Sequence, residues 1–153
     1  MKHSIQIYVK FNNQKSNIMD TNLKKVLMRK YPHLFNNNSE LISSEFEKVE
    51  KLNLSFENLT SIEGIEIFSN LQYLNCYNNQ LTSLNVQGLD NLETLNCANN
   101  QLTSLNVQGL DNLETLKFDK TVKLDVPFVF NTSMYCAFQA ADKTIRCGCF
   151  KGS

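Results

Sequence analysis

The chain has 153 residues, with fifteen basic and fifteen acidic side chains, two histidines and no tryptophan. This length fits one domain, and the balanced charge excludes the basic excess that is typical of proteins binding nucleic-acid phosphates. No stretch approaches the roughly 18 apolar residues of a membrane span, so neither nucleic acid nor a membrane is expected as a partner.

The first residues, SIQIYVKF at positions 4–11, alternate polar and apolar side chains. This alternation predicts a strand with Ile5, Ile7 and Val9 on one face. The segment lacks the continuous apolar stretch of a signal peptide. For the chain as given we therefore expect a cytoplasmic location, or a secreted or surface location if a leader was removed.

Apolar residues recur at helical spacing in the segment 18–31, which predicts a helix. Its inward positions are Leu23, Val26, Leu27 and Tyr31. Asp20 or Thr21 suits the N-cap, because a short polar side chain can accept a hydrogen bond from a free backbone N–H. Pro32 ends the helix, because proline disfavours a helical conformation in the residue before it.

A second short helix is predicted at the start of the segment 43–52, SSEFEKVEKL, leading into the first repeat strand. Ser44 and Glu47 have the spacing of a capping box, in which each side chain bonds the other residue's backbone N–H.

The predicted elements divide the chain into three parts. They are an N-terminal strand and helical cap at 1–48, repeats at 49–118 and a C-terminal cap or tail at 119–153.

The strongest signal is an internal repeat. Residues 71–91 read LQYLNCYNNQLTSLNVQGLDN and residues 92–112 read LETLNCANNQLTSLNVQGLDN. These units differ at three positions, namely Gln72/Glu93, Tyr73/Thr94 and Tyr77/Ala98. A degenerate unit precedes them at 49–70, and a further unit begins at Leu113 and then decays. Repetition at this period is the signature of a solenoid of about three to four units.

Each unit predicts one short strand with a buried face, because Leu74 and Cys76, like Leu95 and Cys97, alternate with polar residues. Asn79 and Asn100 stand where the chain leaves the strand, and their amides can bond backbone groups of their own coil and of the next. Gly88 and Gly109 are expected at tight return turns. The apolar residues expected to return along the convex side are Leu84, Val86, Leu89, Leu105, Val107 and Leu110.

These units resemble the bacterial leucine-rich repeat family in which cysteine often takes the third core position, as in NCYNNQLTSL and NCANNQLTSL. The resemblance covers residues 18–118, since IMDTNLK at 18–24 and GIEIFSNL at 64–71 are similar to the internalin-like helical N-terminal cap. It implies an α/β fold, a short right-handed solenoid with a parallel concave sheet and a helical N-terminal cap. The residues of the tail add a β-hairpin-like C-terminal cap to the expected fold. Many members carry a calcium-binding loop of the D-x-N-x-D-G type, but LFNNNSELISSE lacks its early acids and its glycine.

The tail contains two strand-like runs, MYCAF and TIRCGCF, which predict a hairpin over the open end of the solenoid. A metal site is the alternative interpretation of its cysteines, Cys136, Cys147 and Cys149. Their C-x-C spacing is a weaker zinc signal than C-x-x-C, and a fourth ligand would have to come from His3, His33 or another chain. We therefore expect no cofactor, with this metal site as the open alternative.

The odd total of five cysteines argues against a disulfide framework. Cys76 and Cys97 are interpreted as reduced core residues lying one above the other. No nucleophile elbow, zinc-protease motif, phosphate loop or dinucleotide-binding motif is present in the sequence. We therefore expect a protein that is not an enzyme.

The same alternation predicts which side chains face outward from the concave sheet. The candidate binding residues are Lys51, Asn53, Tyr73, Asn75, Tyr77, Thr94, Asn96, Thr115 and Lys117, with Ser55, Ala98 and Asp119 at flanking positions. Tyrosine is enriched at binding hot spots, although exposed tyrosines can also reflect neutral drift between duplicated units. The leading hypothesis is a protein- or peptide-binding module; the alternatives are a metal-bearing adaptor and a scaffold that self-associates through open strand edges.

Overall fold

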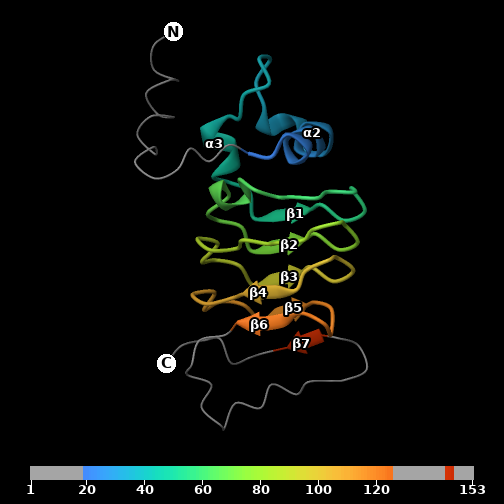
Figure 1. The fold of residues 1–153 in the computed structure, drawn as a ribbon. Coiled ribbons are helices and arrows are strands. Elements are labelled where there is room, and N and C mark those ends of the chain that lie inside the picture. The colour runs from blue at the N-terminus through green and yellow to red at the C-terminus, as the bar shows by residue number, and fades with distance from the viewer. Residues whose placement is uncertain (1–18, 126–143, 147–153) are drawn as a thin grey trace, which may run out of the picture.

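The computed structural model describes residues 19–125 and the backbone of residues 144–146. The predicted strand at 4–11, the three tail cysteines Cys136, Cys147 and Cys149, and most of the predicted C-terminal hairpin lie outside these residues. Within them, a helical cap lies over a stack of coils whose strands run side by side (Figure 1). The helices are α2 (Thr21–Lys30) and α3 (Ser43–Phe46), with the single-turn helices η1 (Pro32–Leu34) and η2 (Ile65–Ile67).

The main sheet takes one three-residue strand from each of four coils and one from the C-terminal tail, and its order is β1-β2-β3-β5-β7. The strands are β1 (Lys51–Asn53), β2 (Tyr73–Asn75), β3 (Thr94–Asn96), β5 (Thr115–Lys117) and β7 (Thr144–Arg146). The first four pair in parallel with their leucines in register, Leu52 beside Leu74, then Leu95 and Leu116. β7 pairs antiparallel with β5. The predicted parallel-sheet solenoid is therefore confirmed.

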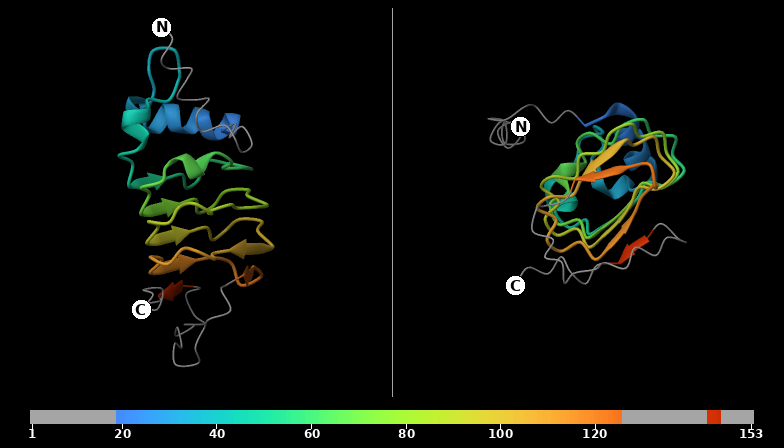
Figure 2. Two further views of the ribbon diagram at one scale, coloured as in Figure 1. Left: turned by 90° about the vertical axis from the view of Figure 1, so that its left-hand side faces the viewer. Right: turned by 60° about the horizontal axis from the view of Figure 1, so that its bottom comes forward.

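A second, two-stranded sheet lies on the other side of the coils (Figure 2). It consists of β4 (Ser104–Asn106) and β6 (Lys123–Asp125), which pair in parallel. The sequence interpretation assigned only core-filling residues to this return side. The pairing arises because Leu105 and Leu124 point inward while their polar neighbours face solvent, which is the alternation of a half-buried strand.

The core is a set of leucine columns between the two sides of the coils. Leu52, Leu74, Leu95 and Leu116 form the strand column, and each is 0% or 1% exposed. The return-side residues predicted as core are all buried as well. Burying one leucine side chain contributes roughly 1.5–3 kcal/mol, so this repeated burial is what holds neighbouring coils together.

The cap helix α2 covers the first coil with its apolar face. Leu23, Val26 and Leu27 are buried, as the spacing predicted. Asp20 is the N-cap, because its Oδ1 accepts hydrogen bonds from the backbone N–H groups of Asn22 and Leu23, both at 2.9 Å. The helix ends two residues before Pro32. This closes one end of the core against water.

The predicted capping box of Ser44 and Glu47 is wrong. The helix α3 is a single turn whose N-cap is Ile42, with no side-chain capping bond, and Glu47 is its C-cap. A capping box needs the acidic residue in the first turn after the N-cap, and here the chain has already left the helix at that position. The carboxylate of Glu45 instead accepts a hydrogen bond from Lys48 Nζ at 2.9 Å.

Asparagine side chains join each coil to the one before it. The Nδ2 of the buried Asn79 donates to the carbonyl of Leu54 at 2.8 Å and to that of Cys76 at 2.9 Å. Its Oδ1 accepts from the backbone N–H groups of Glu57 and Leu59. The prediction that Asn79 bonds its own coil is confirmed by the bond to Cys76. The prediction that it also bonds the following coil is wrong, because its partners outside its own coil belong to the preceding coil.

Asn100 repeats this arrangement one coil later. Its Nδ2 donates to the carbonyls of Cys76 and Cys97, and its Oδ1 accepts from the backbone N–H of Leu81. At the return turns Gly88 and Gly109 have φ of 87° and 80°. Glycine adopts this left-handed conformation without steric cost, which confirms their predicted role.

Candidate binding surface

The outward side chains of β1, β2, β3 and β5 form one continuous surface, which we call the strand face. The strand registers align them in two columns. One column is Lys51, Tyr73, Thr94 and Thr115, and the other is Asn53, Asn75, Asn96 and Lys117. All eight are half-buried or exposed. The structure thus brings together the residues that the sequence predicted, and their role in binding stays a prediction.

The asparagines of the second column stabilise the turn that follows each strand. The Oδ1 atoms of Asn53, Asn75 and Asn96 each accept a hydrogen bond from the backbone N–H two residues later, at 3.1, 3.0 and 3.3 Å. This contact is an Asx-turn, which bends the chain out of the strand. Their oxygens are therefore committed, and only their Nδ2 groups are available to a partner.

Tyr77 lies just beyond β2, and its contacts hold it in place. Its hydroxyl accepts a hydrogen bond from Asn99 Nδ2 at 2.9 Å. Its ring meets that of Phe56 edge to face, with centroids 5.4 Å apart and an interplanar angle of 70°. Phe56 is 65% exposed. The sequence interpretation missed Phe56, although the first coil reads FENL where the next two read NNQL.

The helical cap covers the outer edge of β1. The backbone N–H of Asn53 donates to the hydroxyl of Tyr31 at 2.8 Å, and the ring of His33 lies edge-on to that of Tyr31. An unpaired strand edge is a template for pairing with another chain. Because Tyr31 satisfies this edge group, β1 does not offer it for self-association.

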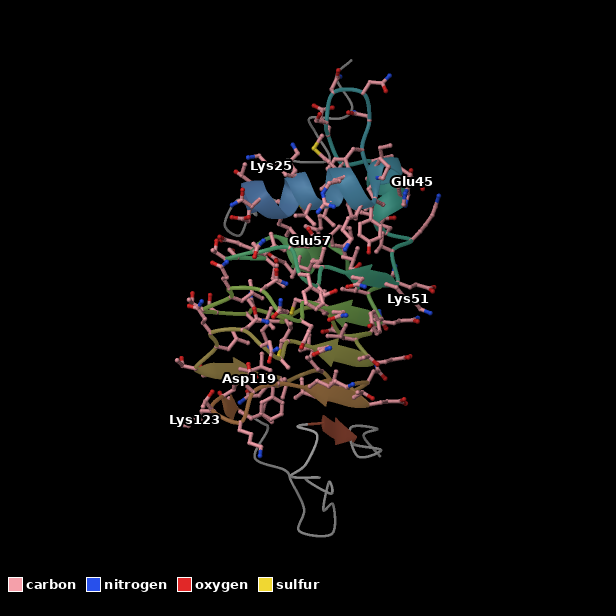
Figure 3. All side chains as sticks on the ribbon, turned by 90° about the vertical axis from the view of Figure 1, so that its right-hand side faces the viewer. Lys25, Glu45, Lys51, Glu57, Asp119 and Lys123 are labelled. Atoms are coloured by element: carbon pink, nitrogen blue, oxygen red, sulfur yellow. The ribbon has the colours of Figure 1, made fainter. Side chains whose placement is uncertain are left out.

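An ion-pair cluster also joins the cap to the first coil. Glu57 forms ion pairs with Arg29 and, at 3.0 Å, with Lys30 Nζ. In Figure 3, Glu57 lies directly below α2. Its side chain is 12% exposed, whereas that of Arg29 is 63% exposed. Two cations thus meet one carboxylate at the edge of the cap, which leaves this corner of the molecule positively charged.

Cys76 and Cys97 are buried core thiols, as predicted. Each Sγ donates to a carbonyl of the following coil at 3.4 Å, that of Asn96 and that of Lys117 respectively. Burial raises the pKa of Cys76 well above its ordinary value and that of Cys97 to about 12. Both therefore stay protonated near neutral pH, and a protonated thiol is a poor nucleophile and metal ligand.

Two observations bear on other classes of site, and both concern residues 19–125 and 144–146. No three histidine, cysteine, aspartate or glutamate side chains there are grouped so that they could hold a metal ion. No helix in this part of the chain is long and apolar enough to cross a membrane.

The chain is similar to an internalin from Listeria monocytogenes, with 28% sequence identity and a TM-score of 0.53. The match covers 69% of this chain and 31% of that one, so this chain spans about a third of the length of its relative. No family model matches the chain, and no curated protein matches it.

This likeness and the parallel-strand solenoid are consistent with a bacterial leucine-rich repeat family. The fold supports a protein-binding repeat module in general, and internalin-like repeat folds are generally non-enzymatic.

Proposed function

We propose that this chain binds a protein or peptide partner across its strand face. The observation that carries the proposal is the ordered column Lys51, Tyr73, Thr94 and Thr115, with Lys117 beside its far end. These side chains project from a rigid sheet, and binding groups held on regular elements are placed more precisely than groups on loops. The partner would contact the tyrosine near the centre and the lysines at the two ends.

The two middle coils indicate where the surface is specialised. Their core residues are identical, and two of their three differences, Tyr73/Thr94 and Tyr77/Ala98, lie on the strand face or just beyond it. The rings of Tyr73 and Tyr77 are half-buried. A half-buried tyrosine loses little side-chain entropy on binding and offers both a ring and a hydroxyl, which suits a contact anchor.

The size of the strand face limits the partner. Strands lie about 4.8 Å apart, so four parallel strands give a platform roughly 15–20 Å wide. This width suits an extended peptide or one edge of a folded domain. A partner of either kind would replace water at the Nδ2 groups of Asn75 and Asn96 with hydrogen bonds of its own.

The alternative functions stay predictions. The cysteines of the metal-bearing adaptor, Cys136, Cys147 and Cys149, lie outside the described residues, so that function stays a prediction. Self-association stays a prediction as well, and the expected cytoplasmic location is likewise untested.

The test is affinity capture from a lysate of the source cells. The wild-type chain is compared with the double variant Tyr73→Ala/Lys117→Ala, which removes a ring and a charge from the strand face. The control is Thr82→Ala/Thr103→Ala, because these threonines hold the same position in the two middle coils, are exposed and lie outside β2 and β3. We expect a specific partner that is lost with the first variant and kept with the control. A partner kept equally by both variants would contradict the proposal.

A further inference from the structure

Phe56 is the exception in an otherwise regular set of loops. It is the one large apolar side chain that is exposed among residues 19–125. Its backbone N–H bonds the carbonyl of Tyr77, as the N–H of Asn78 bonds that of Ala98 one coil later. Phe56, Asn78 and Asn99 all have positive φ, at 61°, 54° and 55°. Phenylalanine therefore occupies a backbone position that asparagine fills in the next two coils.

Folding alone does not favour phenylalanine at this position. The left-handed conformation is tolerated by asparagine and is unfavourable for a bulky L side chain. Most of the ring also stays in water, so burial offers little compensation. Residues held in strained conformations cluster at ligand contacts, and a residue that is both strained and exposed is best explained by contact with a partner.

The neighbours of Phe56 fix its environment. Tyr77 packs against it edge to face, and the hydroxyl of Tyr77 is held by Asn99. The two rings lie together just beyond the C-terminal ends of β1 and β2, and we call this pair of rings the step. A large apolar side chain of a partner can pack against both rings and become the third member of the cluster.

The charge next to this step is positive. Glu57 follows Phe56 directly and is bound by Arg29 and Lys30 at the end of α2. The helix carries no acidic residue within Thr21–Lys30, and its basic residues are Lys24, Lys25, Arg29 and Lys30. The single carboxylate of Glu57 cannot neutralise these four positive charges, and the Arg29 side chain remains 63% exposed.

We propose that the step of Phe56 and Tyr77, together with the basic end of α2, binds an acidic peptide segment that carries a large apolar side chain. The apolar side chain would rest on the two rings, and the carboxylates would face Arg29. The inference rests on the proposed function, because the same partner would continue from this step onto the strand face. A lipid surface is disfavoured, because membrane-binding faces present several large apolar side chains and this corner presents one.

The first experiment selects random phage-displayed peptides on the intact immobilised chain. We expect the enriched peptides to carry aspartate or glutamate beside leucine, phenylalanine or tryptophan. The affinity of the enriched peptide is then measured by fluorescence anisotropy. Phe56→Asn restores the residue of the next two coils, so it should fold, and we expect it to weaken binding about tenfold or more, as for loss of an aromatic anchor.

Two variants that each remove one positive charge test the basic end of α2. Arg29→Gln removes one exposed cation, while Glu57 keeps Lys30, and we expect binding to weaken about threefold at low salt. Lys48→Gln is the matched control, because it also removes one cation from an ion pair of the cap, the pair of Lys48 with Glu45, and keeps both Arg29 and Lys30. It should leave the affinity unchanged.

Several results would overturn the inference. They are no enriched peptide, enriched peptides without acidic residues, and equal binding to the wild type and Phe56→Asn. Capture by phosphatidylserine vesicles that depends on Phe56, with no enriched peptide, would assign the step to a lipid surface and overturn it as well. Peptides whose binding depends on Tyr73 and Lys117 but not on Phe56 would overturn the inference and leave the proposed function standing. Peptides whose binding depends on Phe56, Tyr73 and Lys117 would support both.

Discussion

The first coil and the middle coils use different side chains to join the element that precedes them. Each coil must be joined to whatever precedes it, and the joint falls five residues after the strand leucine. Asn79 and Asn100 hold this position in the middle coils and donate to backbone carbonyls of the coil before. Glu57 holds it in the first coil and pairs with Arg29 and Lys30 of the cap.

The difference follows from what the neighbour offers. A preceding coil presents backbone carbonyls and N–H groups that the turn leaves unpaired, and a neutral amide matches both kinds of group. A preceding helix uses most of its carbonyls in its own hydrogen bonds, so at this position α2 offers side chains rather than backbone groups. Because the last turn of α2 is basic, a carboxylate is the complementary group.

Of the variants that test this comparison, Asn79→Ala should have the largest effect on stability. It leaves the carbonyl of Leu54 and the N–H of Leu59 without their buried partner. We expect the free energy of unfolding to fall by about 3–5 kcal/mol, since each unsatisfied buried group costs about 1–3 kcal/mol. Urea denaturation measures it. Asn78→Gly is the control, because glycine accepts the positive φ of that exposed residue; a similar loss in both variants would contradict the account.

Alkaline pH should weaken the middle coils more than the first, because Cys76 and Cys97 occupy the core position that Leu54 holds in the first coil. Burial raises the pKa of Cys97 from its ordinary 9.0 to about 12, so the unfolded chain loses this proton first. The stability that comes from the buried thiol is therefore complete below pH 9 and is lost as the pH rises toward 12. The loss approaches about 1.4 kcal/mol per pH unit for one thiol.

This pH dependence is checked by urea denaturation from neutral to alkaline pH. Cys97→Ala should flatten the alkaline decline, whatever its effect at neutral pH. Leu54→Ala removes a buried side chain from the equivalent position of the first coil and should keep the slope of the wild type. Equal slopes in the wild type and Cys97→Ala would show that the thiol is not responsible.

Glu57→Gln should have a smaller effect, confined to the joint with the cap. The variant removes a mostly buried carboxylate from two cations, and we expect a loss of about 1–2 kcal/mol in unfolding free energy, between the values of exposed and buried pairs. The control is Glu45→Gln, because Glu45 pairs with the exposed Lys48. Water screens an exposed pair of this kind, so the control should change stability much less than Glu57→Gln. Calorimetry at low salt compares them, and equal losses would reject an electrostatic joint.

Phe56→Asn should have the smallest effect on stability. Relief of the left-handed conformation offsets the lost ring contact with Tyr77, so we expect a change in unfolding free energy of less than about 1 kcal/mol. Thermal denaturation measures it, with Leu59→Ala as a positive control for core damage in the same loop. A loss comparable to that of Leu59→Ala would mean that Phe56 is retained for folding rather than for binding.

Much of the fold follows from the sequence because its determinants are periodic. The leucine spacing within each unit specifies which side chains are buried, and the constant period places Leu74 beside Leu95. The same periodicity predicts the strand face, since the residues between buried positions must point outward. The sequence limits the N-cap to Asp20 or Thr21, because a cap depends on neighbours only two and three residues away, and the structure shows that it is Asp20.

The remaining features depend on contacts that carry no period. Tyr31 reaches Asn53 across 22 residues, and no local pattern links those two positions. The direction of the Asn79 bonds depends on which coil lies within reach, which only the folded stack decides. Phe56 was missed because the outward positions were traced along the strands and ended at Ser55, whereas the exposed ring lies in the loop that follows.

The most direct test of the central claim, that this chain binds a partner through the strand face, is a dissociation constant. The partner captured by the wild type is titrated against Tyr73→Ala/Lys117→Ala and against Thr82→Ala/Thr103→Ala. We predict a loss of affinity of about tenfold or more for the first variant, as expected for a central tyrosine anchor, and no change for the second. Equal dissociation constants for the wild type and both variants would contradict the claim.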